Sequence, residues 1–529
     1  MSTQSTPGID ETGVPDHPSR SDGFVRGLSG LIGGPLGDHA VARKRPSGGE
    51  RRFWTAVRIV LALTCLTLAL HWVQKSPCQD GAWANNEQYT RFCYTDVLAL
   101  YYAERLNEGA VPYRDHPVEY PVLTGYFMGA LGLPVHAVGD GNPEINQGQW
   151  FYNLNVLVLG ALAVATVAVL LALRRRRPWD AALFALAPAL LLTATVNWDL
   201  LAIGLAAFGL LAWARTGSGR TLRIRLPERW LPQGWHDRAR ALSFEVNTGL
   251  LLAALAGVLI GLAGAAKMWP LFILGPILVL AIRAGRVWAA LLSIITAAVT
   301  VVAVNLPVAL PEATRDGWKR FFELNTDRPI DWGTLWYIAR YLDGKFGDPG
   351  SLGPFQWLDA NIPTLNYLSY ALFGLACLGI GALALLAPRR PRLGQLAFLV
   401  VAAFLIFSKV WSQQFVLWLL PLVVLARPKW GAFLVWQAAE VCYFVAFYGE
   451  LLGASTGRPV FPEGVFVLAA SLRLVTVVAL VVLVVREILH PERDAVRSTY
   501  PDDPDGGLID GSPDAPWLDR WRSRRATTA

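Results

Sequence analysis

Acidic and tyrosine side chains gather in one polar stretch, residues 78–125, which follows the first apolar segment of the chain. Asp96 stands at the start of a run of apolar and tyrosine residues, so its carboxylate could cap the N-terminus of a helix. At a membrane–water boundary, the same carboxylate could instead accept a proton from an incoming hydroxyl group. Tyr94, Glu119 and Tyr120 lie in the same stretch, where Glu119 is a rival acid. Asp96 is our first candidate for acid–base chemistry.

Two lysines and one further acid stand where apolar runs end. Asp199 closes a short Asn-Trp-Asp turn between two apolar runs, where it is either a solvated turn residue or part of a site. Lys267 and Lys409 each follow an apolar run and precede an aromatic segment. Both could simply extend their ammonium groups into water. Alternatively they hold a phosphate, because a buried anion needs cationic partners; Gln414 could then hydrogen-bond the phosphate or a sugar.

Two cysteines share the first polar loop. Cys78 and Cys93 lie 15 residues apart, and no zinc-type spacing exists in the chain. A disulfide closing a loop of this length would stabilise the fold by roughly 3 kcal/mol in the chain-entropy model. Two free thiols are the alternative. The sequence also shows no His/Asp cluster that would argue for a metal site.

A second polar segment is rich in aromatic residues. Trp332 and Trp336 lie within Asp-Trp-Gly-Thr-Leu-Trp-Tyr. Such residues suit a membrane interface or stacking on a sugar ring.

The composition shows which elements must position these side chains. The chain has 529 residues, of which 53% are hydrophobic and 16% charged, and its mean hydropathy is +0.37. A soluble domain is rarely so apolar, and in lipid the backbone must pair within helices. We predict an all-α polytopic membrane protein with about twelve transmembrane helices, at 53–73, 150–173, 178–195, 200–214, 248–266, 269–282, 287–309, 365–387, 393–408, 412–426, 430–449 and 463–486.

Basic clusters between the predicted spans set the orientation. They recur on one side, which the positive-inside rule assigns to the cytoplasm together with the basic insertion 215–247 and both termini. The membrane domain then covers 51–487, with large extracytoplasmic loops at 74–149 and 310–364. We interpret 119–137 as an interfacial helix rather than a crossing. The tails, 1–50 and 488–529, have the composition of disordered segments.

Two charged residues fall inside predicted spans. Glu440 and Arg473 each lie about ten residues, or roughly 15 Å, from the start of spans that run in opposite directions. Because a lone charge at that depth is costly, we predict a structural ion pair between them.

Short motifs recur along most of the membrane part of the chain. They are Cys93-Tyr94-Thr95-Asp96, Val111-Pro112-Tyr113, Glu119 through Gly125, Asn197-Trp198-Asp199, Lys267-Met268-Trp269-Pro270 and Lys409 through Pro421. Together they resemble the glycosyltransferase 87 family, which comprises polyprenol-phosphate-dependent mannosyltransferases with the GT-C membrane fold. The chain departs from the family pattern at Val122 and Gln413, where proline is common.

The resemblance implies a specific reaction that needs neither a metal nor another cofactor. A hexose, with mannose as the first choice, would pass from a polyprenyl-phosphate lipid donor to a lipid-linked or cell-envelope glycan acceptor, on the extracytoplasmic face of a bacterial plasma membrane. Asp96 would match the family's first-loop acid and deprotonate the acceptor hydroxyl, and the anomeric carbon would be inverted. From their positions, Lys267 and Lys409 could stabilise the leaving phosphate.

Two alternatives stay open at this point. The same scaffold could transfer arabinofuranose from a polyprenyl phosphate. A transporter or flippase of lipid-linked glycans would instead carry internal repeats and polar residues near the bilayer midplane, where only Glu440 and Arg473 fit. Nucleic acid is not an expected partner, because the basic residues lie in short clusters between spans.

Overall fold

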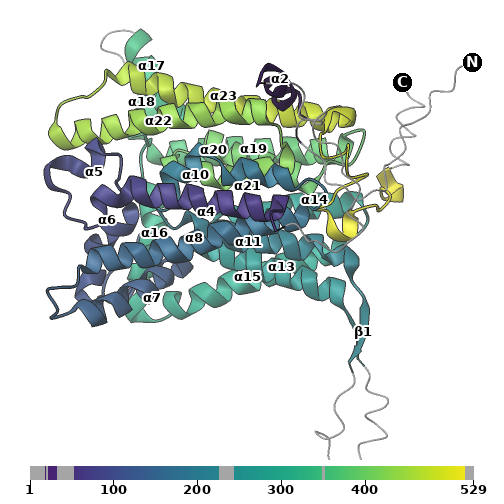
Figure 1. The fold of residues 1–529 in the computed structure, drawn as a ribbon, viewed down its shortest axis with the longest axis horizontal. Coiled ribbons are helices and arrows are strands. Elements are labelled where there is room, and N and C mark those ends of the chain that lie inside the picture. The colour runs from purple at the N-terminus through teal and green to yellow at the C-terminus, as the bar shows by residue number, and fades with distance from the viewer. Residues whose placement is uncertain (1–17, 19–21, 33–52, 225–243, 348–351, 519–529) are drawn as a thin grey trace, which may run out of the picture.

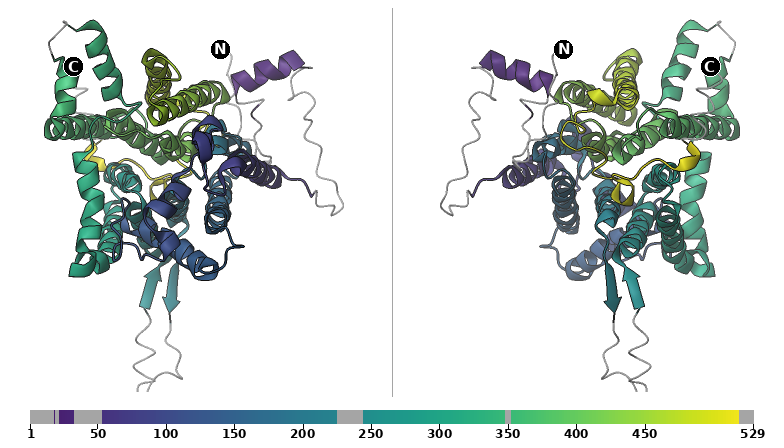
Figure 2. Two further views of the ribbon diagram at one scale, coloured as in Figure 1. Left: turned by 90° about the vertical axis from the view of Figure 1, so that its left-hand side faces the viewer. Right: turned by 90° about the vertical axis from the view of Figure 1, so that its right-hand side faces the viewer.

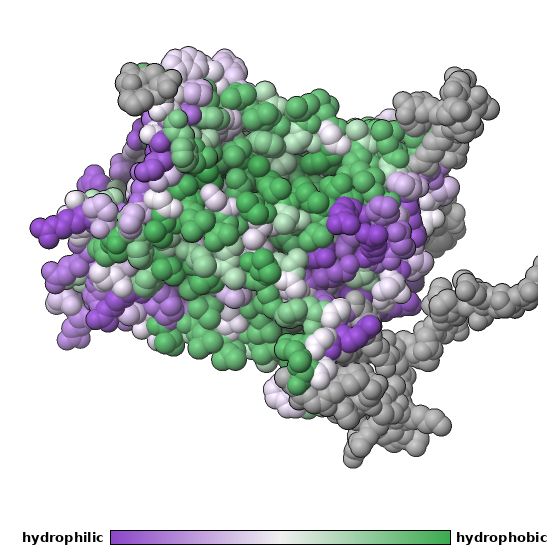
Figure 3. Space-filling model, turned by 90° about the horizontal axis from the view of Figure 1, so that it is seen from above, coloured by the Kyte–Doolittle hydropathy of each residue, from purple (hydrophilic) through white to green (hydrophobic). Residues whose placement is uncertain are grey.

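The protein is a bundle of long helices that run side by side (Figure 1). The computed structural model describes residues 18, 22–32, 53–224, 244–347 and 352–518. Figure 3 shows a broad apolar band between two hydrophilic ends. Among the described residues, nine helices are long and apolar enough to cross a membrane: α4 (Ala56–Lys75), α7 (Val122–Gly139), α8 (Gln147–Leu173), α11 (Asp199–Ala214), α13 (Thr248–Ala266), α15 (Val287–Ala309), α19 (Ile362–Leu386), α22 (Trp430–Thr456) and α23 (Glu463–Leu489). The protein is therefore an all-helical multi-pass membrane protein in its main architecture.

Shorter apolar helices fill the interior of the bundle. They are α14 (Leu274–Arg283), which continues η7 (Trp269–Ile273), α20 (Leu393–Phe407), and α21 (Val416–Ala426), which continues η8 (Gln413–Phe415). Every residue of α21 is buried. A helix that is apolar on all sides belongs in the core, surrounded by other helices.

The segment predicted as one helix at 178–195 is broken into three pieces. These are η4 (Pro178–Ala181), α9 (Ala182–Ala185) and α10 (Pro188–Thr193). Pro178 and Pro188 each begin a piece. Proline suits the first turn of a helix, but it has no N–H with which to continue the preceding one. The prediction of a continuous helix is wrong here, although most of the segment is buried.

Helix α7 has both of its ends at the end of the bundle that holds Asp96, on the left in Figure 1. Near its start, the Thr124 hydroxyl donates to the carbonyl of Ala266, at the end of α13 (2.7 Å). At its other end, Gly139 packs so closely on Gln147 that an added Cβ would lie 2.4 Å from Gln147 Cγ. Helix α7 thus leads back to the start of α8.

The Asp96 end also carries short elements that lie outside the long helices. The left panel of Figure 2 faces this end. The helices there are η1 (Ser76–Cys78), η2 (Ala84–Asn86), α5 (Glu87–Thr90), α6 (Asp96–Ala103), η3 (Leu106–Glu108), α16 (Glu312–Asp327), α17 (Leu335–Phe346) and α18 (Pro354–Ala360).

The opposite end of the bundle carries a small antiparallel hairpin of β1 (Thr221–Ile224) and β2 (Phe244–Asn247), which follows η5 (Thr216–Ser218) and projects away from the helices (Figures 1 and 2). The hairpin departs from a purely α-helical fold. Residues 225–243, most of the predicted basic insertion, lie outside the described residues.

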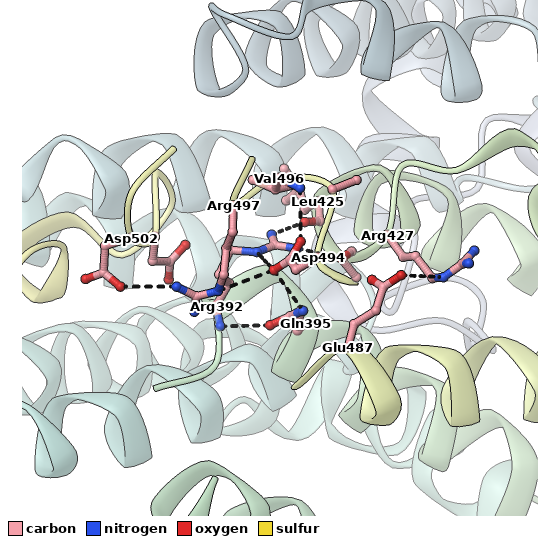
Figure 4. A network of polar contacts seen from close by, with 12 residues as sticks. Arg392, Gln395, Leu425, Arg427, Glu487, Asp494, Val496, Arg497 and Asp502 are labelled. Atoms are coloured by element: carbon pink, nitrogen blue, oxygen red, sulfur yellow. Dashed lines mark hydrogen bonds and ion pairs between the residues drawn. The ribbon is translucent and has the colours of Figure 1, made fainter. Parts of the chain in front are cut away.

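The C-terminal segment 490–518 packs against this same end, so the prediction of a disordered tail is wrong for these residues. It includes η9 (Pro491–Arg493) and η10 (Gly507–Ile509). Asp494 pairs with buried Arg392 at 2.7 Å, and Asp505 pairs with buried Arg174 at 2.5 Å. Figure 4 shows the network around Arg392. The polar composition of this segment favours disorder. Composition cannot show that its acids pair with arginines that lie far away in the sequence.

The predicted N-terminal tail is described only in part. Helix α2 (Gly23–Ile32) follows Asp22, whose Oδ2 accepts a hydrogen bond from the backbone N–H of Trp430 (2.7 Å). The rest of the two predicted tails lies outside the described residues, apart from the C-terminal segment.

Candidate active site

Asp96 is the first residue of α6, but its carboxylate does not cap the helix. Thr95 does so, because its hydroxyl oxygen accepts from the backbone N–H of Val97 (3.2 Å). The backbone N–H of Asp96 donates to the carbonyl of Val196 (2.8 Å), which fastens the loop to the bundle. The Asp96 side chain is partly exposed, and its carboxylate is available for contacts other than the helix cap.

Asn197 connects this acid to a lysine through the two ends of its amide. Asn197 Nδ2 donates to Asp96 Oδ2 at 2.7 Å and to the hydroxyl of Tyr120 at 2.5 Å. Asn197 Oδ1 accepts from Lys267 Nζ at 3.2 Å. The amide orientation follows from these partners, since Lys267 can only donate and a carboxylate only accepts. Three segments predicted to contribute to a site therefore meet at one side chain.

Lys267 is enclosed by an aromatic face and a second carboxylate. Its Nζ lies 4.6 Å from the centre of the Tyr120 ring and 3.6 Å from Asp199 Oδ1. Asp199 is fully buried and accepts a hydrogen bond from Trp418 Nε1 (2.7 Å). The alternative of a solvated turn residue is therefore excluded for Asp199. With 9% of its surface exposed, Lys267 does not extend freely into water either.

The electrostatic surroundings of Asp96 act in opposite directions. Burial raises the pKa of its carboxyl group, whereas hydrogen bonds from Asn197 and Tyr94 and the charge of Lys267 lower it. The negative charge of Asp96 in turn raises the pKa of the Tyr94 hydroxyl. Burial is the largest effect, so the pKa of Asp96 lies above its usual value, which makes the ionised carboxylate a stronger proton acceptor.

Glu119 lies between the acid and a set of cations. Burial and the Asp96 charge raise its pKa, and the charges of Arg328, Lys267 and Arg320 lower it. Arg320 belongs to α16 and Arg328 follows that helix, so the second large polar segment supplies positive charge to the first. No sequence pattern indicates a role for these two arginines, because only the packing of α16 brings them to Glu119.

The loop that carries Asp96 is held in place on its other side as well. Cys78 and Cys93 form the expected disulfide, with 5.7 Å between their Cα atoms. Lys75 Nζ donates to the carbonyl of Tyr94 (3.1 Å) and contacts the hydroxyl of Tyr448 (3.4 Å). Lys75 is buried at the end of α4, so it positions the loop.

Lys409 and Gln414 occupy different places from the one expected for a phosphate pair. Lys409 Nζ donates to the carbonyl of Thr326 (3.0 Å), at the C-terminus of α16. Burial lowers its pKa to about 8, while Asp327 opposes this shift. A cation at a helix C-terminus stabilises the helix. Gln414 is buried in η8, next to Phe415, whose ring centre lies 5.9 Å from Lys267 Nζ.

The two tryptophans predicted to meet an acceptor pack elsewhere. Trp336 is 2% exposed and donates its Nε1 hydrogen to the carbonyl of Phe407 (3.0 Å). Trp332 packs edge-on against Phe447 and Phe466, with ring centres 6.0 and 6.5 Å apart. The expectation of an accessible sugar platform is wrong for Trp336, because its ring is part of a buried cluster.

Arg473 and Glu440 form the ion pair expected inside the bundle, with 3.1 Å between Nε and Oε2. Arg473 also donates to the carbonyls of Trp411 and Ser412 (3.0 Å each). This pair therefore fixes the turn that leads into η8, and so has a structural role near the site.

A small apolar groove opens beside Tyr120. It encloses about 60 Å³, and its lining comes from the start of α7, from α13 and its following turn, from α15 and from α16, including Met268, Leu271, Phe321 and Phe322. Among the described residues, no group of three or more His, Cys, Asp or Glu side chains could hold a metal ion.

Comparisons with known proteins give weak matches only. No family model and no curated protein matches the chain. Two solved structures of an oligosaccharyltransferase from Archaeoglobus fulgidus align over 82% of this chain at 12% identity. One is AglB in complex with an inhibitory peptide and a dolichol-phosphate (TM-score 0.33), and the other is tethered to an acceptor peptide containing the NVT sequon (TM-score 0.31). The chain spans 56% and 55% of their lengths, and superpositions at this level define no family for it.

Proposed function

We propose that the protein is a membrane glycosyltransferase that moves a sugar, mannose as the first choice, from a polyprenyl-phosphate donor to a hydroxyl group of a glycan acceptor. The observation that carries this proposal is the Asp96–Asn197–Lys267 arrangement. It places a partly exposed carboxylate and a lysine ammonium on the two ends of one amide. The arrangement lies at the end of the bundle where α6 begins (Figure 1), and both ends of the apolar band are hydrophilic (Figure 3).

The lipid part of such a donor has a suitable neighbour. The apolar groove next to Tyr120 and Met268 is close to Lys267 in sequence and in space. A polyprenyl chain lying there would place its phosphate beside Lys267, with Arg320 and Arg328 on the Glu119 side. Cations stabilise a phosphate leaving group as its negative charge grows.

The reaction would form one bond and break another at the anomeric carbon. Asp96 accepts the proton of the acceptor hydroxyl while the hydroxyl oxygen attacks the anomeric carbon. The bond from that carbon to the phosphate oxygen breaks, and the phosphate leaves. Attack from the face opposite the leaving group inverts the configuration. Asn197 holds Asp96 in position and remains unchanged.

A transfer assay tests the proposal. Purified protein in lipid nanodiscs receives radiolabelled polyprenyl-phosphate mannose, or the arabinofuranose donor, together with a bacterial membrane glycan extract. We expect transfer by the wild type and a loss of about 10²- to 10⁴-fold in Asp96→Asn, the range typical of a general base. Glu144→Gln, a change at an exposed loop position, is the matched control.

Two results would contradict the proposal. One is wild-type transfer from neither donor, accompanied by movement of lipid-linked glycans across vesicle membranes, which would identify a transporter. The other is an Asp96→Asn variant that transfers sugar at the wild-type rate.

A further inference from the structure

A polar pocket, distinct from the apolar groove, lies beside the candidate active site. It is open, measures about 670 Å³, and lies between the first polar loop and α16. Its lining includes Glu104, at the end of α6, and Glu119, which directly precedes Tyr120, whose hydroxyl accepts from Asn197 Nδ2 at 2.5 Å. One carboxylate therefore borders both the pocket and the Asp96 site.

The Glu104 carboxylate is buried without being satisfied. The residue is 4% exposed, and neither carboxylate oxygen has a hydrogen-bond partner among the described residues. The backbone N–H of Glu119 interacts with it favourably but does not reach hydrogen-bond geometry. Buried carboxylate oxygens are nearly always paired, because leaving them unpaired costs free energy. A ligand hydroxyl could supply the missing partner, because a carboxyl group accepts hydrogen bonds in both its protonated and its ionised form.

The other charges of the pocket show which donors are suitable. Asp115 is already paired with Arg114 at 2.8 Å, and Asp316 interacts with Lys319 at 3.4 Å. The lining contains four carboxylates and two arginines, so an anionic ligand would meet repulsion. A neutral polyhydroxyl ligand fits better, since its hydroxyls can donate to carboxylates and accept from arginines.

The walls of the pocket are firmly built. Tyr113 has a φ of +67°, in the left-handed region, and its hydroxyl donates to the carbonyl of Tyr120 (3.0 Å). An added Cβ at Gly125 would lie 2.2 Å from that hydroxyl, and one at Gly317 would lie 2.6 Å from the Tyr113 carbonyl oxygen. Such strained positions cluster where a surrounding site holds them. Tyr113 thus joins the loop, α7 and α16 around the pocket.

We propose that this pocket binds a neutral sugar residue of the acceptor through hydroxyl groups that donate to Glu104, and that it presents the next hydroxyl to Asp96. This inference rests on the proposed function, because it assigns the acceptor side of the same reaction. The donor phosphate and its lipid remain on the Lys267 side.

Sugar binding can be measured without turnover. Saturation-transfer NMR would compare methyl α-mannopyranoside and α-1,6-mannobiose as probes on the protein in nanodiscs. We expect signals with the wild type and with Asp96→Asn, and at least a fivefold weaker signal with Glu104→Leu. Glu108→Gln is the matched control, because Glu108 is exposed and pairs with Arg105 outside the pocket.

A second variant guards against misfolding of Glu104→Leu. Ala313 is exposed on the pocket wall contributed by α16, so Ala313→Trp fills the pocket without changing any charge. It should weaken the sugar signal and raise the acceptor KM at least tenfold, while the donor KM stays within twofold. Absence of a wild-type signal, or equal signals in wild type, Glu104→Leu and Ala313→Trp, overturns the inference. If sugar binding depends on Glu104 but no transfer is found, only the proposed reaction fails.

Discussion

Asn197 Nδ2 lies 2.7 Å from Asp96 Oδ2, and this hydrogen bond crosses from the turn before α11 to the first polar loop. The two residues are 101 positions apart in the sequence. The bond fixes the direction of the carboxylate, while the other end of the same amide holds Lys267. Positioning of this kind lets an acid and a cation act on one substrate without first reorganising.

Removing the Asn197 amide should change the pH dependence of transfer. In Asn197→Ala, the Asp96 carboxylate loses a hydrogen bond that stabilises its charged form, so the pKa of Asp96 rises. A general base works only when deprotonated, so the acidic limb of the pH profile of kcat/KM should move to higher pH. We also expect a loss of about 10- to 100-fold at pH 7, as for partners that orient a reactive group.

The profile separates this role from a purely structural one. If Asn197→Ala lowers activity by the same factor at every pH, Asn197 supports the fold and does not tune Asp96. Thr124→Val provides a comparison, because it removes a buried hydrogen bond to Ala266 near the site without touching Asp96.

Lys267 and Lys409 should behave differently when each is neutralised. Lys267 lies beside Asn197 and Asp199, so Lys267→Met should reduce kcat/KM for the donor by about 10²- to 10³-fold, as expected for loss of a charge that stabilises a leaving group. Lys409 instead binds the carbonyl at the end of α16, so Lys409→Met should mainly lower the thermal midpoint. Parallel donor titrations and thermal unfolding in nanodiscs measure both effects. If Lys409→Met reduces kcat/KM for the donor as much as Lys267→Met does, Lys409 also binds the donor phosphate.

The sequence allowed the centre of the site to be predicted, but not its surroundings. Asp96, Asp199 and Lys267 could be predicted to lie near one another, because each stands at a boundary between an apolar and a polar segment. Such boundaries lie close together when they fall at the same end of a helical bundle. Arg320, which α16 brings toward Glu119, could not be predicted, since no periodic pattern reports how an exposed helix packs on a loop.

The same limit explains the errors in the fold. Arg392 belongs to one of the basic clusters that indicate only orientation in the sequence, although its guanidinium is buried against Asp494. Prolines at 178 and 188 divide a segment whose overall hydropathy is that of a span. Hydropathy averages over such breaks, and it carries no information on partners that lie 102 residues away, as Asp494 does from Arg392.

Glu104 should make the protein less stable as the pH rises. Burial and the charge of Glu119 raise its pKa to about 8, above the usual value of 4.5. Between these values the folded state binds more protons than the unfolded state, so the free energy of unfolding falls with increasing pH. Glu104→Gln removes this proton uptake and should flatten the decline between pH 5 and pH 8. Thermal midpoints across that range measure it, and an unchanged slope would show that Glu104 is ionised in the folded protein.

The C-terminal segment should contribute to stability through its buried acids. Asp494→Asn leaves the guanidinium of Arg392 buried opposite a neutral amide, and breaking a buried ion pair from one side costs about 3–5 kcal/mol. We expect a clearly lower thermal midpoint, together with protease cleavage within 490–518 under conditions in which the wild type is resistant. Glu492→Gln is the matched control, because Glu492 is exposed in the same segment. The network of Figure 4 lies at the opposite end of the bundle from α6, which begins at Asp96 (Figure 1), so the surviving folded fraction should keep its donor KM. A changed donor KM with an unchanged thermal midpoint would instead reveal coupling between the two ends of the bundle.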